Sequence, residues 1–150
     1  MTASIAADTL PEPRSAPAPV EVERGTGQPI DLVLRRIAGF ADLQPDWDSY
    51  GGDPPSALAR SEAVRWVEIV SELFGARVGM AVVPYSVAPL ANGGVQIEWH
   101  GRNGIVELEV GPEGELAYLL VMSEGASTDA EESGDASWSD VLRRLLRAFV

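Results

Sequence analysis

The sequence predicts an α+β fold in which an antiparallel β-meander of about three to five strands packs against about three helices. Apolar residues recur with helical spacing near residues 30–40, 57–74 and 138–150, and they alternate with polar residues in between. The first 28 residues are instead rich in Ala, Pro, Ser and Glu, without apolar periodicity. We therefore expect a disordered N-terminal tail at residues 1–28 and a single α+β domain at residues 29–150.

Each predicted helix has an apolar stripe. The second helix begins after an N-cap at Ser56 and ends near Phe74, because Gly75 suits the position after a helix. In the C-terminal helix, residues 138–150, apolar side chains share one face and arginines the other. The stripes comprise Ile30, Val33, Leu34, Ile37 and Phe40; Ala59, Ala63, Trp66, Val67, Val70, Leu73 and Phe74; and Val141, Leu142, Leu145, Leu146 and Phe149.

Short alternating runs predict the strands. Val95, Ile97 and Trp99 alternate with polar residues, so we expect these three side chains to face the core. Residues 123–137 are small and acidic, which predicts a flexible acidic loop before the last helix. The predicted strands cover residues 80–88 with an interruption at Pro84, 95–99, 106–110 and 116–122.

The charge and composition exclude several classes of function. The net charge is −12 and the chain contains no Lys, which argues against binding of nucleic acid or of an anionic membrane and favours a basic protein partner. The absence of Cys excludes disulfides and thiolate metal sites, and a single His excludes a multi-histidine site within one chain. No phosphate-binding or dinucleotide-binding motif is present, so we expect no cofactor.

The location follows from the first residues. Residues 1–20 lack the basic and apolar regions of a secretory signal, so we expect a cytoplasmic protein. Residues 78–97 carry no charge, but their prolines, glycines and amides fit strands and turns better than a membrane-spanning helix.

The segment from Asp46 to Asp53 is the first candidate site. Its three carboxylates, with Trp47, Asp48 and Tyr50 among its residues, could bind a cation or a sugar, although the ligand spacing of a calcium loop is absent. The alternative is structural: Trp47 and Tyr50 would fill the core while Asp48 and Asp53 cap backbone N–H groups.

The second candidate site is the hairpin that a two-residue turn at Arg102-Asn103 would close. This register places Glu98 opposite Glu107 and Gln96 opposite Glu109, and opposed like charges are unfavourable. An arginine, a cation, a basic partner or water should offset them. The hairpin is then a solvated face, an acidic patch for a partner, or a catalytic or metal-binding pair.

His100 follows Glu98 on the polar face of the same strand. It could serve as a general base, but no motif of a nucleophilic serine accompanies it, so an exposed histidine near the turn is the other interpretation.

Two motifs resemble those of a small, uncharacterised bacterial protein family with a WDxYG-type loop and a GGxQxEW-type strand. They are W-D-S-Y-G-G-D-P-P-S at residues 47–56 and G-G-V-Q-I-E-W at residues 93–99. The resemblance spans about residues 43–120 and implies no activity. It implies that the loop and strand residues Trp47, Tyr50, Gln96, Glu98 and Trp99 form one connected cluster.

The sequence favours a non-enzymatic protein-binding or regulatory module of the antitoxin, immunity or accessory type. The acidic hairpin and the absence of Lys support this interpretation. One alternative is a small metal-dependent or carboxylate-based hydrolase that uses Glu98, Glu107, Glu109 and His100, or the acidic loop. Another is a structural subunit of a larger assembly, tethered by the C-terminal helix or the N-terminal tail.

Overall fold

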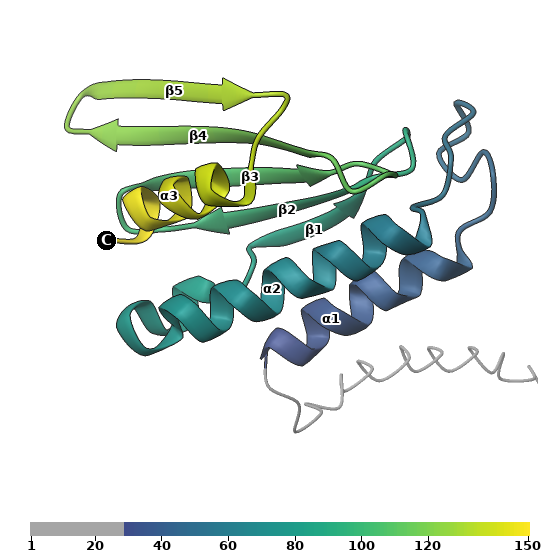
Figure 1. The fold of residues 1–150 in the computed structure, drawn as a ribbon, viewed down its shortest axis with the longest axis horizontal. Coiled ribbons are helices and arrows are strands. Elements are labelled where there is room, and N and C mark those ends of the chain that lie inside the picture. The colour runs from purple at the N-terminus through teal and green to yellow at the C-terminus, as the bar shows by residue number, and fades with distance from the viewer. Residues whose placement is uncertain (1–28) are drawn as a thin grey trace, which may run out of the picture.

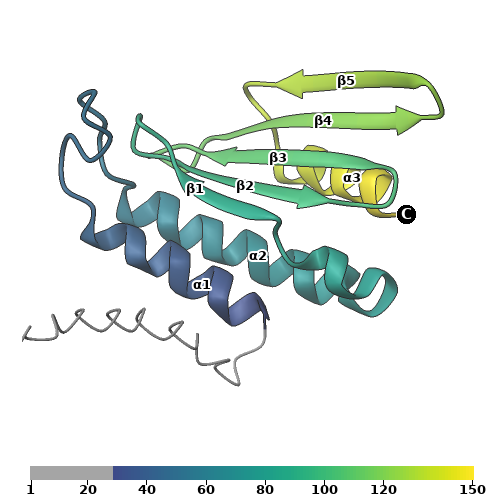
Figure 2. The ribbon, with the colours of Figure 1, turned by 180° about the vertical axis from the view of Figure 1, so that it is seen from behind.

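The computed structural model describes residues 29–150, and in it helices pack on one face of a five-stranded antiparallel sheet (Figures 1 and 2). The predicted α+β class is confirmed; the predicted tail, residues 1–28, lies outside the described residues. The helices are α1 (Pro29–Gly39), α2 (Ala57–Val78) and α3 (Trp138–Phe149), with short 3-10 turns η1 (Phe40–Asp42) and η2 (Gly79–Val82). The strands are β1 (Ser86–Pro89), β2 (Val95–His100), β3 (Gly104–Val110), β4 (Leu116–Glu124) and β5 (Ser127–Ser133).

The helices begin where side chains can satisfy their first N–H groups. Ser56 accepts a hydrogen bond from the Ala59 N–H at 3.0 Å and donates its hydroxyl to the Pro112 carbonyl at 2.6 Å, which ties the start of α2 to the β3–β4 turn. In α3, Ser137 and Asp140 form a reciprocal capping box. These caps confirm Ser56 as an N-cap and position α2 and α3 against the sheet.

The sheet follows the chain as a meander, with strand order β1-β2-β3-β4-β5. The predicted hairpin register is confirmed, because Glu98 pairs with Glu107 and Gln96 with Glu109 across β2 and β3. Successive side chains of a strand point to opposite faces. The register therefore assigns each strand residue either to the helix-covered inner face or to the uncovered outer face.

The core lies between the inner face and the helices. Trp99 is 1% exposed, as its alternation with Val95 and Ile97 predicts, and its indole N–H donates to the Val82 carbonyl at 3.1 Å. Trp66 of α2 stacks on Trp138 of α3, with ring centroids 3.8 Å apart. The buried inner-face residues are Val87, Val95, Ile97, Trp99, Val106, Leu108, Val110, Leu116, Tyr118 and Leu120.

The predicted flexible loop at residues 123–137 is wrong over much of its length. Strand β4 continues to Glu124, and β5 pairs with it in antiparallel register from Tyr118–Ser133 to Glu124–Ser127. No residue of β5 is buried, so the alternating apolar signal of a strand is missing from its sequence.

Two further boundaries differ from prediction. Residues 80–83 were expected to be strand, but η2 occupies Gly79–Val82 and β1 starts only at Ser86. Helix α2 passes through Gly75 and ends at Val78, before Gly79 with φ of 57°. A single glycine inside a helix lowers the stability of that helix by only about 1 kcal/mol relative to alanine. The extra helical turn after Gly75 places Val78 against the core.

Candidate functional site

The outer face of the sheet is where most of the predicted site residues meet. No described helix lies over this face, and in Figure 2 the strands lie in front of α3. One register row crosses all five strands and contains, in order, Ser86, Glu98, Glu107, Leu119 and Glu132. The neighbouring row contains Ala88, Gln96, Glu109 and Ala117. The register therefore gathers Gln96, Glu98, Glu107 and Glu109 on one surface, as the sequence predicts.

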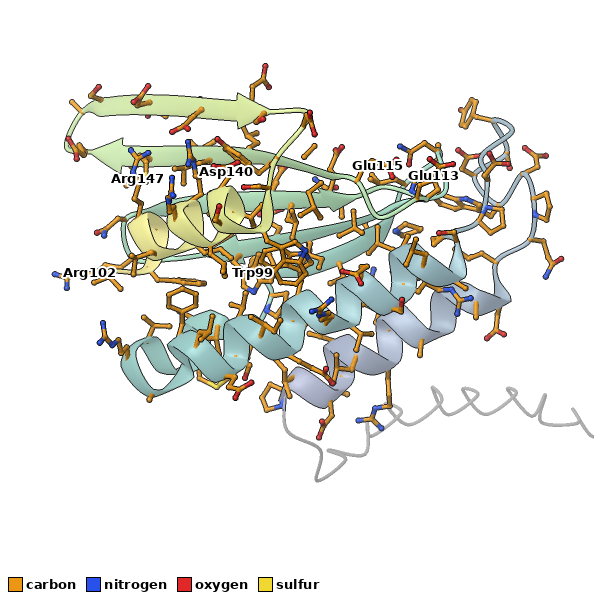
Figure 3. All side chains as sticks on the ribbon, in the orientation of Figure 1. Trp99, Arg102, Glu113, Glu115, Asp140 and Arg147 are labelled. Atoms are coloured by element: carbon orange, nitrogen blue, oxygen red, sulfur yellow. The ribbon has the colours of Figure 1, made fainter. Side chains whose placement is uncertain are left out.

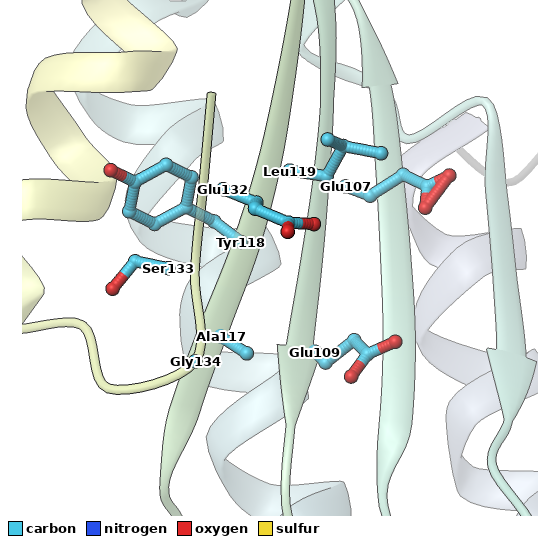
Figure 4. Close-up of a pocket in the computed structure, with 8 residues that line it drawn as sticks. All are labelled: Glu107, Glu109, Ala117, Tyr118, Leu119, Glu132, Ser133 and Gly134. Carbon is cyan, nitrogen blue, oxygen red and sulfur yellow. The ribbon is translucent and has the colours of Figure 1, made fainter. Parts of the chain in front are cut away.

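An open hollow of about 510 Å³ lies on this face over β3, β4 and β5. Figure 4 shows Glu107, Glu109 and Glu132 on the same side of the sheet, whereas Tyr118 points to the other. The small or apolar side chains of Ala117 and Leu119 lie between them on β4. Among the described residues that line the hollow none is basic, so it is an acidic surface with an apolar floor.

Opposed Glu98 and Glu107 each have a separate partner. The Gln96 side-chain amide donates to the Glu107 carboxylate at 2.8 Å, and Glu98 contacts the His100 imidazole at hydrogen-bond range. The repulsion between these two carboxylates is therefore offset by the Gln96 amide and the His100 imidazole, both on β2, rather than by an arginine. Glu109, which is exposed, has Gln96 as its register partner on β2.

His100 lies at the end of this face, next to the β2–β3 turn. Its ring stacks on Tyr85, with centroids 3.9 Å apart and planes 10° from parallel, while Nε2 contacts a Glu98 carboxylate oxygen. A carboxylate that holds one imidazole nitrogen fixes the orientation of the ring. The histidine is exposed, as expected near the turn, and it is held from two sides.

The sequence analysis does not predict the part of the hollow that β5 forms. Glu132 and Ser133 line it, but they fall within the residues that were predicted to form a loop. Glu132 shares a face with Leu119 only because β5 pairs with β4. The acidic composition of residues 123–137 was visible in the sequence, but it does not indicate how these residues pair with β4.

Polar contacts on the inner side hold β5 in place. Glu131 accepts hydrogen bonds from the Arg144 guanidinium, with Nε to Oε1 at 3.0 Å, and from Arg147 Nη1 at 2.9 Å. The Tyr118 hydroxyl donates to the same carboxylate at 2.9 Å, and the Arg144 guanidinium lies 5.0 Å from the Tyr118 ring centroid. Figure 3 shows Arg147 on the side of α3 nearest to the β4–β5 hairpin.

These contacts shift three pKa values in the directions that the bonding requires. Hydrogen bonds from Arg144, and then from Tyr118, lower the pKa of Glu131 because they favour its charged form. The pKa of Arg144 is raised, mainly by the same bond with Glu131. Burial, followed by the hydrogen bond to Glu131, raises the pKa of Tyr118. Glu131 is therefore a structural carboxylate that holds the wall of the hollow.

The Asp46–Asp53 loop is organised by its own carboxylates. Asp48 accepts hydrogen bonds from the N–H groups of Tyr50 and Gly52, both at 2.9 Å, and these bonds lower its pKa. A Cβ atom at Gly52 would lie 2.7 Å from the Asp48 carboxylate, so any larger residue there would displace that carboxylate. Asp46, rather than the predicted Asp53, makes the second cap, to the Gly51 N–H at 2.7 Å.

The aromatic residues of this loop differ in position. Trp47 is half-buried, and its indole N–H donates to the Asp53 carbonyl at 3.0 Å. Tyr50 is 93% exposed, so the expectation that it fills the core is wrong. The loop thus presents one aromatic ring to solvent on a hydrogen-bonded frame.

The single cluster that the motif resemblance implied does not form. Gln96 and Glu98 lie on the outer face of β2, whereas Trp99 lies on the inner face and reaches Val82. Tyr50 extends into solvent from a separate loop. The two motifs are instead joined through the backbone, since the Ser56 N–H donates to the Gly93 carbonyl at 2.9 Å and Asp53 forms a bridge with Asn92, the residue before the second motif.

Within residues 29–150, no group of three or more His, Asp or Glu side chains is arranged to hold a metal ion. None of the helices in this part of the chain combines the length and the apolar character needed to cross a membrane.

Comparisons with known proteins identify no relative. No protein-family model matches the chain, no curated protein matches it, and no solved structure matches it.

Proposed function

We propose that the outer face of the sheet is a docking surface for a basic protein, and that the chain is a non-enzymatic binding or regulatory module. The observation that supports this best is the open hollow, in which Glu107, Glu109 and Glu132 surround an apolar floor without a basic residue among the described lining. A protein of net charge −12 would also attract a basic partner over long range.

The chemistry of the hollow fits arginine or lysine side chains of the partner. Such side chains lay their aliphatic stems on apolar surface and keep their charged ends at polar groups. Leu119 and Ala117 offer that apolar surface, and carboxylates on β3 and β5 lie on both sides of Leu119 in the same register row. Arginine would also form charge-assisted hydrogen bonds with these carboxylates.

The test compares two variants that remove the same charge from different places. One carries Glu107→Gln, Glu109→Gln and Glu132→Gln; the control carries Glu68→Gln, Glu72→Gln and Glu113→Gln, all at exposed positions outside the hollow. We expect an arginine-rich peptide, followed by NMR, to shift outer-face resonances in the wild type and in the control but not in the hollow variant. Proteins captured from a native lysate at low salt should follow the same pattern.

Equal losses in the two variants would mean that net charge, not this face, attracts the peptide. Unchanged binding in the hollow variant would overturn the proposal directly. Binding that persists at high salt in the wild type would also contradict it, because exposed ion pairs are screened over about 10 Å at 0.1 M salt.

A second candidate function is a carboxylate-based hydrolase, and the Glu98–His100 contact favours it, since a carboxylate that orients an imidazole is the usual arrangement of a general base. Turnover of an activated ester by the wild type, with loss in His100→Gln and partial loss in Glu98→Gln, would support it. Turnover that survives His100→Gln would exclude this pair as its source.

A further inference from the structure

A second hollow, also of about 510 Å³, lies where α2, α3 and the β2–β3 turn end together, and it shares no lining residue with the acidic one. Arg77 comes from the last turn of α2, Arg102 from the β2–β3 turn, and Phe149 from the last turn of α3. Figure 3 shows Arg102 projecting from the molecule near the end of α3. The volume lies within the range of about 300–1,000 Å³ that is typical of small-molecule sites.

The charge of this hollow is opposite to that of the rest of the molecule. Arg77 and Arg102 line it together with His100, although acidic residues outnumber basic residues by 23 to 11 in the chain. Within residues 29–150, neither arginine side chain has a hydrogen-bond or ion-pair partner. None of the described lining residues has an acidic side chain, so the side chains that line the hollow carry a net positive charge.

The floor of the hollow is apolar and packs against the core. Phe149 is 3% exposed and packs against Phe74, with ring centroids 5.3 Å apart, while Val78 and Ala81 are half-buried beside the core. This combination of an apolar floor and cationic rim suits a ligand that carries a negative group on an apolar body. Arginine is well adapted to such a group, because its donors match a carboxylate in a bidentate geometry.

The β2–β3 turn is locked to the end of α3. The Asn103 N–H donates to the Ala148 carbonyl at 2.8 Å, and its side-chain amide donates to the Arg147 carbonyl at 3.3 Å. A Cβ atom at Gly101 would lie 2.3 Å from the Ala148 carbonyl oxygen, so the turn can approach the helix this closely only with glycine. The backbone at Arg102 is therefore held in place by its neighbours Gly101 and Asn103 before any ligand binds.

The ends of two helices meet here, and their carbonyl dipoles disfavour an anion. Asn103 satisfies two carbonyls of α3, the Val150 N–H donates to Leu146 at 3.0 Å, and the Gly79 N–H donates to Gly75 at the end of α2. Arg77 and Arg102 are the lining residues whose charged side chains have no polar partner among residues 29–150. Affinity for an anion must therefore come mainly from Arg77 and Arg102, since the His100 imidazole, which also lines the hollow, is engaged by Glu98.

We propose that this hollow binds a small monocarboxylate with an apolar chain, whose carboxylate is held by Arg77 and Arg102 and whose chain lies on Phe149, Val78 and Ala81. The inference is independent of the proposed docking function, because the two hollows lie on different parts of the molecule and have opposite charge.

The test uses octanoate as the probe for the full chain, with calorimetry for affinity and NMR for location. We expect saturable binding that shifts the amide resonances of Gly101 and Phe149. Acetate, which lacks the chain, and 1-octanol, which lacks the charge, should each bind more weakly. Arg77→Gln and Arg102→Gln should each weaken octanoate binding by roughly tenfold or more, in line with the contribution of charge-assisted hydrogen bonds.

Arg36→Gln is the matched control, since Arg36 is an exposed arginine on α1 that does not line the hollow. It should leave octanoate affinity unchanged, and Arg102→Lys should restore part of what Arg102→Gln loses. Three results would overturn the proposal: no saturable binding, equal affinity for octanoate and 1-octanol, or equal weakening by Arg36→Gln. A lowered melting temperature in the two glutamine variants without any octanoate binding would show that the arginines act only on the helix ends.

Discussion

The β2–β3 hairpin and the β4–β5 hairpin have the same backbone pairing but are stabilised by different interactions. In β2 and β3, every second side chain is buried under the helices, whereas β5 has no buried residue. Strand β5 is held instead by one carboxylate, Glu131, that binds two arginines of α3 and the Tyr118 hydroxyl. One sheet thus combines a part fixed by apolar burial with an edge fixed by charge. The two parts should respond differently to mutation and pH.

The largest effect should come from the apolar hairpin. Trp99→Ala removes a side chain that is 1% exposed and bonded to the Val82 carbonyl, and we expect it to lower the free energy of unfolding by ~3–5 kcal/mol. Chemical denaturation measures this. Tyr50→Ala, at a position 93% exposed, should change stability by less than about 0.5 kcal/mol. A loss below about 1 kcal/mol for Trp99→Ala would mean that the hairpin does not depend on its buried face.

A smaller, local effect is expected in the edge hairpin. Glu131→Ala removes the carboxylate that joins β5 to Arg144 and Arg147, so amide hydrogen exchange in β5 should become faster while exchange in β2 and β3 stays the same. Glu132→Ala is the control, since its side chain faces the outer side of the same strand. If both variants accelerate exchange equally, the contacts with α3 do not hold the edge.

The two hairpins also differ in how well their sequences predict the strands and their register. The alternation of Val95, Ile97 and Trp99 identified the strand, and the two-residue turn at Arg102-Asn103 then fixed the opposition of Glu98 and Glu107. Those signals are local. Four predicted site residues therefore share one face of β2 and β3, as the alternation requires: Gln96, Glu98, Glu107 and Glu109.

Strand β5 lacked such a signal, because what holds Glu131 is a pair of arginines 13 and 16 residues away along the chain. No sequence pattern within Ser127–Ser133 indicates that Glu131 contacts Arg144 and Arg147. For the same reason the β5 wall of the acidic hollow, with Glu132, was not foreseen. The arginine-rimmed hollow was missed as well, since Arg77, Arg102 and Phe149 meet only when three distant chain segments end at one place.

Acid should weaken the edge hairpin specifically. The hydrogen bond from Arg144, and then that from Tyr118, lowers the pKa of Glu131 below its ordinary value of 4.5. A lowered folded-state pKa means that the contribution of Glu131 to stability is complete above that ordinary value and is lost as pH falls through the folded-state pKa. The difference in unfolding free energy between the wild type and Glu131→Ala should therefore disappear at acid pH. A difference that persists there would show that the contact does not depend on the charge of Glu131.

The smallest effect should come from a carboxylate on the outer face of the apolar hairpin. Glu107 accepts a hydrogen bond from the neutral Gln96 amide, and Glu98 opposite it is engaged by His100, so Glu107→Gln removes little repulsion and leaves an acceptor for Gln96. We expect a change within about 0.5 kcal/mol in chemical denaturation, with little dependence on salt. Glu131→Gln is the informative comparison, because the same change of a carboxylate to an amide there removes the partner of two guanidiniums and should loosen β5. If Glu107→Gln stabilised the chain clearly and salt reproduced the gain, the opposed glutamates would still repel each other despite their partners. If it destabilised the chain as much as Glu131→Gln does, the outer face would depend on charge as the edge does, and the distinction between the two hairpins would fail.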